Sequence, residues 1–180
     1  MIPTEHISSL IPQDGLILGK MYKNMERLFE EQFRYPISMM VSVVFLAPVC
    51  EEIFFRGILL NGLLHNKTHP IKAILFSSFL FGAIHMNPWQ FVGGMLIGSL
   101  LGLVYFCTRS ISHCIMLHAF NNSFAALTLL YKKEYGSDPI TEFLNANSWL
   151  FFLAFGLTVV SGYMLINQTK KHRENGLYHR

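Results

Sequence analysis

The sequence predicts an all-α fold, a polytopic transmembrane helical bundle of about five spanning helices with an N-terminal amphipathic helix. Of its 180 residues, 52% are hydrophobic and only 14% are charged, against about a quarter charged in typical soluble domains. A mean hydropathy of +0.37 favours the same class. The net charge is only +3, and the basic residues lie in flanks and connections. We therefore expect the lipid bilayer, and no nucleic acid, as a partner.

The chain divides into three parts. Residues 1–36 form an N-terminal segment in which residues 20–35 place apolar side chains at helical spacing with charges between them. We expect this helix to lie at the membrane interface and to end at Pro36. Residues 37–167 are expected to form a transmembrane core, and residues 168–180 a basic tail.

Five apolar stretches in the core are candidate spans. The first, residues 37–64, is long enough to cross a bilayer with some tilt. The third carries Gly94, Gly98 and Gly102 at four-residue spacing, which lets a neighbouring helix approach closely in a membrane. We therefore expect the third span to lie at the centre of the bundle. The five stretches cover residues 37–64, 71–86, 89–106, 113–131 and 149–166.

The first span contains three charged residues within the sequence CEEIFFRG. Each charge near the centre of a spanning helix costs about 2.5 to 3.5 kcal/mol on insertion scales. Glu52 and Arg56 are four residues apart, the favourable order for an ion pair on one helix face. Glu51 lies about 100° further round and needs a partner from another helix. Pro48, just before it, is expected to bend the helix and leave a carbonyl unpaired.

Two further spans carry polar groups in apolar surroundings. His85 stands near the end of the second span, and His118 and Asn122 share one face of the fourth. Alone, each is compatible with helix packing, but polar groups on three separate spans are functional candidates. A carboxylate with two imidazoles can either hold a divalent metal with an open water position or activate water directly. Both routes lead to hydrolysis.

These residues resemble the motifs of the CPBP intramembrane proteases, the family that includes CAAX-type prenyl endopeptidases and bacteriocin-processing or self-immunity proteins. The family motifs EExxxR, FxxxH and HxxxN appear in order, each on its own apolar segment, and the resemblance covers about residues 40–130. The N-terminal part departs from the family, because relatives often carry additional spans before the first motif. The matching stretches are EEIFFR (Glu51, Glu52, Arg56), FGAIH (Phe81, His85) and HAFNN (His118, Asn122).

The resemblance implies endoproteolysis inside the membrane. Glu51 and His85 would activate the attacking water, and His118 and Asn122 would ligate a metal or stabilise the oxyanion. Glu52 belongs to the same catalytic set and, with Arg56, would support the site. A zinc ion held by Glu51, His85 and His118 is one scheme and a metal-free glutamate mechanism is the other. The sequence lacks the HExxH spacing of secure zinc proteases.

The leading hypothesis is therefore an endopeptidase of a bacterial cell membrane that cuts a membrane-associated peptide or lipid-modified protein. A non-catalytic bacteriocin self-immunity protein on the same scaffold is the alternative. A transporter with Glu51 and Glu52 in a proton relay is the weakest hypothesis, because the chain shows no duplicated half.

Overall fold

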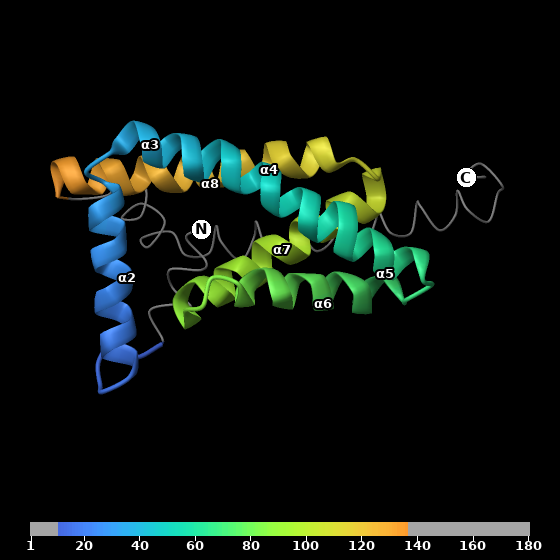
Figure 1. Cartoon of the computed structure of the whole chain (residues 1–180), viewed down its shortest axis with the longest axis horizontal. Helices are drawn as coiled ribbons and strands as arrows, with labels where there is room; N and C mark the ends of the chain where they lie inside the picture. Colours follow the sequence, from blue (N-terminus) through green and yellow to red (C-terminus); the bar gives the residue numbers. More distant parts are fainter. Residues whose placement is uncertain (1–10, 137–180) are drawn as a thin grey trace, which may run out of the picture.

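Helices make up nearly all of residues 11–136, the part of the chain described by the structure, which is a computed structural model (Figure 1). Three helical runs there are long and apolar enough to cross a membrane. Large apolar side chains remain exposed on them, with Ile58 62% and Phe120 71% exposed, as expected where side chains face lipid. The protein is an all-α integral membrane bundle, as predicted. The three runs are Pro36–His65, Pro88–Thr108 and Ile111–Tyr135.

The first run is one long helix with two irregular stretches. Two of its segments are π-helical. This conformation is rare in proteins, and where it occurs it is often at a functional site. Pro48 lies two residues after the last residue of the first π-helical segment, and its missing N–H accounts for the departure from α-helical hydrogen bonding there. The segments in chain order are α3 (Pro36–Met40), η1 (Val41–Leu46), α4 (Ala47–Glu52), η2 (Ile53–Leu60) and α5 (Asn61–His65).

The predicted amphipathic helix is α2 (Leu18–Gln32), which runs crosswise at one end of the bundle (Figure 1). Its end differs from the prediction. The helix stops at Gln32, and Pro36 is the first residue of α3, where a proline loses no intrahelical hydrogen bond. The prediction that Pro36 ends the amphipathic helix was therefore wrong, because this proline begins the first spanning helix instead.

A tight hairpin of α6 (Pro70–Ala83) and α7 (Pro88–Thr108) forms the second layer (Figure 1). The two helices meet through glycines. A Cβ atom on Gly94 would lie 2.9 Å from the Cα atom of Gly82, and one on Gly82 would lie 2.6 Å from the carbonyl oxygen of Phe91. The glycine stripe of α7 thus provides the close packing that its spacing predicted.

The helix α8 (Ile111–Tyr135) returns alongside η1 and α4. Ser110 begins it as a side-chain cap, with its Oγ accepting from the backbone N–H of His113 at 3.4 Å. Gly136, with a positive φ of 72°, follows its last residue. The α8 helix therefore brings the third motif against the first.

The second apolar stretch is shorter as a helix than residues 71–86. It ends at Ala83 after 14 residues, a length of about 21 Å, against about 30 Å for a bilayer core. His85 therefore lies in the turn after α6 rather than inside it. The predicted fifth span, 149–166, and the basic tail, 168–180, lie outside the described residues.

Candidate active site

Glu52 and Arg56 form the ion pair that their spacing predicted. Arg56 Nη1 donates to Glu52 Oε1 at 2.7 Å, and both side chains are buried. The second guanidinium nitrogen, Nη2, donates to the carbonyl oxygen of Gly98 on α7 at 2.9 Å. The guanidinium carbon also lies 4.8 Å from the ring centroid of Phe81 on α6. One buried arginine therefore ties the long helix to both helices of the hairpin.

His118 of α8 completes this cluster. Its Nδ1 lies 2.8 Å from Glu52 Oε1, and because a carboxylate only accepts, Nδ1 is the protonated nitrogen. Its Nε2 lies 3.9 Å from Glu51 Oε2. A carboxylate that fixes one ring nitrogen sets the tautomer and aims the other at the site. Glu51 thus has its expected partner from another helix, and Glu52 is the group that orients that partner.

Phe81 and His85 reach the cluster from α6 and the turn that follows it. The Phe81 ring lies 5.6 Å from the His118 ring and 5.8 Å from the His85 ring, centroid to centroid, with edge-on geometry. His85 Nδ1 lies 3.1 Å from the Phe81 carbonyl oxygen, which can only accept, so Nδ1 donates here as well. Both imidazoles therefore keep Nε2 as the nitrogen available for chemistry.

Asn122 lies one helical turn beyond His118 and contacts the first span. Its Nδ2 donates to the carbonyl oxygen of Val43 at 2.9 Å. In a π-helical turn the carbonyl of Val43 would accept from the backbone N–H five residues later. That residue is Pro48, which has no N–H. Asn122 supplies a donor at the place where Pro48 removes one, and this contact fixes α8 against η1.

The predicted residues are thus gathered to different degrees. Glu51, Glu52 and His118 lie together, and His85 joins them through the ring of Phe81. The side chains of Glu51 and His85 form no hydrogen bond or ion pair with each other in the described structure, residues 11–136. Two main-chain carbonyls that hold the site, those of Gly98 and Val43, were not predicted. The available signals were the glycine stripe, which exposes backbone, and Pro48, which frees a carbonyl.

The fit of a metal ion can be tested on these side chains. Within the described part of the chain, no three His, Cys, Asp or Glu side chains come together as a possible metal-binding group. The Nδ1 atoms of His85 and His118 are bonded to Phe81 and Glu52, an arrangement that leaves both Nε2 atoms open to a metal. Among the described residues, however, Glu51 forms an ion pair with only one of the two imidazoles. As arranged here, the proposed zinc ligands Glu51, His85 and His118 do not form a ligand set, and zinc stays a prediction of the resemblance.

Three comparisons bear on this arrangement. The family model described as "Type II CAAX prenyl endopeptidase Rce1-like" matches residues 33–124, a little over half of the chain. The Bacillus subtilis (strain 168) protein "Putative membrane peptidase YdiL" is 27% identical over 139 residues, which are 77% of this chain and 53% of that protein. An "Uncharacterized protein" of Mycoplasma capricolum subsp. capricolum is 29% identical over 137 residues, 68% of this chain and 38% of that protein. The chain therefore spans about half or less of the length of these curated relatives. No solved structure matches it.

Proposed function

Because the chain belongs to the type II CAAX prenyl endopeptidase Rce1-like family of CPBP proteins, we propose that it is an intramembrane endopeptidase. Its substrate would be a membrane-associated peptide or a lipid-modified protein. The observation that carries this proposal is the contact of Glu51 with His118 inside a buried cluster whose second carboxylate, Glu52, fixes the imidazole. Intramembrane carboxylates and imidazoles are costly and are functional by default.

In the proposed mechanism, Glu51 and His85 activate the water that attacks the scissile peptide bond. The two side chains do not bond directly, and a general base can act through one bridging water. With Nδ1 of His85 donating to the Phe81 carbonyl, Nε2 has a lone pair and can accept a proton. Glu51 can take the water proton and later transfer it to the leaving amine.

His118 and Asn122 would stabilise the oxyanion of the tetrahedral intermediate. A protonated His118 donates from Nδ1 to Glu52 and keeps its Nε2–H for the substrate oxygen. Asn122 uses one N–H on the carbonyl of Val43, and its amide carries a second N–H. Donors fixed in this way act without reorganisation during the reaction, and removing one such donor costs about 100-fold to 1,000-fold in kcat.

Glu52 and Arg56 are positioning residues in this scheme. They contact His118, Phe81 and the backbone of α7 rather than the reacting atoms. Their pairing keeps the charge of Glu52 tolerable in an apolar interior, while Glu51 stays outside the ion pair with Arg56. We propose that this division of roles is why the two adjacent glutamates are both present.

The test uses the full chain in lipid vesicles and an internally quenched peptide that ends in a farnesylated C-a-a-X sequence. We expect Glu51→Gln to abolish cleavage while the protein inserts and unfolds as the wild type does. The matched control is Cys50→Ser, which changes the neighbouring exposed residue and should retain activity. Wild-type cleavage by Glu51→Gln would refute the proposal and leave a non-catalytic role on the same scaffold.

A further inference from the structure

The inner side of α2 lines two neighbouring cavities. The first has a volume of about 390 Å³ and lies between α2 and the turn from α6 to α7. The second has about 310 Å³ and lies between α2 and the start of the long helix. Leu28 and Gln32 line both, and Leu28 is 57% exposed. The two cavities therefore form one open groove along α2, which we call the α2 groove.

Specific contacts near both ends hold α2 in this position. The ring of Tyr22 packs edge-on against Trp89 of α7, with centroids 5.2 Å apart. Burial and the nearby carboxylate of Glu26 raise the pKa of Tyr22, so this ring docks as a neutral phenol. Beyond the other end, Lys133 of α8 donates to the carbonyl oxygen of Phe33 at 3.5 Å and lies 5.3 Å from its ring centroid. The helix is thus a fixed wall of the groove.

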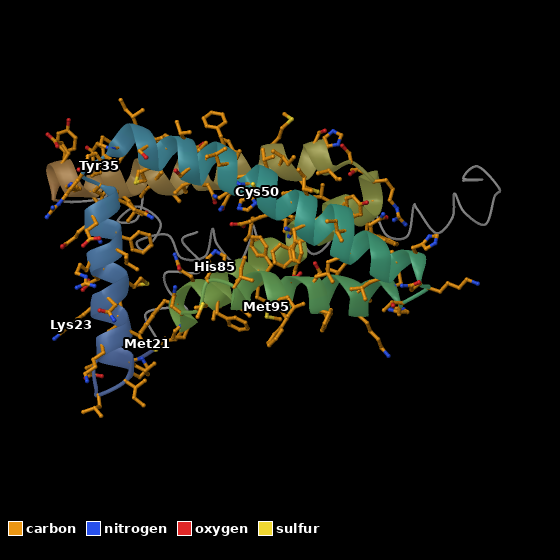
Figure 2. The ribbon with its side chains drawn as sticks, in the orientation of Figure 1. Met21, Lys23, Tyr35, Cys50, His85 and Met95 are labelled. Atoms are coloured by element: carbon orange, nitrogen blue, oxygen red, sulfur yellow. The ribbon has the colours of Figure 1, made fainter. Side chains whose placement is uncertain are left out.

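Each cavity has one lining residue that belongs to the candidate active site or contacts it. His85 lines the first cavity, and Figure 2 shows Met21 on the side of α2 toward the α6–α7 turn, with Lys23 on the opposite side. Val43 lines the second cavity, and its carbonyl is the one that Asn122 holds. A chain lying in the groove would therefore have one end beside the proposed water-activating histidine and the other beside Val43.

The lining of the groove indicates what it can bind. Besides His85, the first cavity offers apolar side chains and amides but no fully charged group. Met side chains adapt to differing apolar shapes, and the amides of Asn24 and Gln32 can pair with both the N–H and the C=O of an extended peptide. The amides of Asn87 and Gln90 instead bond to each other at the start of α7. The second cavity contains one charged side chain, Glu31. The lining residues of the first cavity include Met21, Met25, Phe29, Asn24, Asn87 and Gln90.

From the position of His85 in the groove and from this charge pattern we infer that the α2 groove binds the substrate as an extended peptide. The apolar residues of this peptide lie at the His85 end of the groove, and a basic residue of the peptide lies at the Glu31 end. The inference rests on the proposed function and adds to it the substrate's shape and charge order. The groove is a specificity site that involves none of the motif residues other than His85.

The experiment measures cleavage by the full chain in lipid vesicles. The probes are internally quenched peptides with a farnesylated C-a-a-X end, in which one Lys or one Glu occupies successive positions before the Cys. At one position we expect the Lys peptide to be cleaved about threefold faster in kcat/KM than the Glu peptide, the effect of one partly exposed charge pair. Glu31→Lys should reverse this preference at that position.

Two controls separate binding from structure. Glu30→Lys makes the same charge change on a neighbouring residue that lines neither cavity, and it should keep the wild-type preference. Met25→Glu should lower kcat/KM for all probes at least about tenfold by placing a charge in the apolar cavity, whereas Lys23→Glu, on the opposite side of α2 (Figure 2), should not. If wild type, Glu31→Lys and Glu30→Lys all show the same preference between the Lys and Glu peptides, the groove is not the substrate-binding site. The endopeptidase proposal would still stand. A wild type that cleaves none of the probes would count against both.

Discussion

His118 and Glu52 are joined by a hydrogen bond of 2.8 Å from Nδ1 to Oε1, and the same oxygen accepts from Arg56 at 2.7 Å. One carboxylate oxygen thus connects an imidazole of α8 with a guanidinium of the long helix, and all three side chains are buried. Such a group cannot be removed without leaving a buried cation unpaired. The cluster therefore contributes to stability as well as to orientation.

The first prediction concerns Glu52. Glu52→Ala leaves Arg56 without its carboxylate, and breaking a buried ion pair costs about 3 to 5 kcal/mol. We expect a clear fall in the apparent Tm, measured by thermal unfolding in detergent micelles. Glu30→Ala is the matched control, because it removes a glutamate side chain that is exposed and forms no ion pair within the described residues. Equal apparent Tm values for the two variants would contradict the role of Glu52.

The second prediction concerns the contact of α6 with α7. In Gly82→Ala the new Cβ atom would lie 2.6 Å from the Phe91 carbonyl oxygen, so the helices must move apart. Overpacking of this kind costs about 1 to 3 kcal/mol. Gly62→Ala is the control, because no atom lies within 4 Å of its added Cβ. Gly82→Ala should lower the apparent Tm and cleavage, whereas Gly62→Ala, a change that favours a helix, should lower neither.

The third prediction concerns Asn122 and the carbonyl of Val43. Asn122→Leu keeps the approximate side-chain volume but removes the donor at 2.9 Å from a partly buried carbonyl, a loss of about 1 kcal/mol. We expect a lower apparent Tm and faster hydrogen exchange in residues 43–50. Ser123→Ala, whose hydroxyl bonds only within its own helix, should leave exchange in residues 43–50 at the wild-type rate. An unchanged exchange rate in Asn122→Leu would contradict the contact.

The fourth prediction concerns metal dependence. Because no three-ligand group forms within residues 11–136, we expect cleavage to survive removal of metal by a chelator. Metal content is measured alongside activity on the same preparation. Loss of cleavage that is restored by zinc, and by no other addition, would establish the metal scheme instead.

Local sequence rules were enough to predict the features that lie within one helix. The four-residue spacing of Glu52 and Arg56 predicted their ion pair, and the glycine spacing of α7 predicted close helix packing. Both features depend on helix geometry alone, which is the same wherever the helix lies. The amphipathic pattern likewise predicted α2, although its end was misplaced at Pro36.

Features that depend on two distant segments were beyond such rules. Nothing in the spacing of HAFNN shows that the Nδ1 of His118 faces Glu52 and that only its Nε2 faces Glu51, because this depends on how α8 packs on α4. The partner of Asn122 is a main-chain carbonyl of Val43, freed by Pro48 and by a π-helical turn that a regular period does not indicate. The position of His85 beyond the end of α6 depends on the close contact with α7.

The short length of α6 has a consequence for the surrounding lipid. At about 21 Å, its 14 residues fall about 9 Å short of a typical hydrocarbon core. A bilayer accommodates a short helix by thinning around it, at a cost that grows with the mismatch. Vesicles with shorter acyl chains should therefore favour the arrangement that places His85 beside its cluster, and we expect the proposed cleavage to be faster in them than in thicker bilayers.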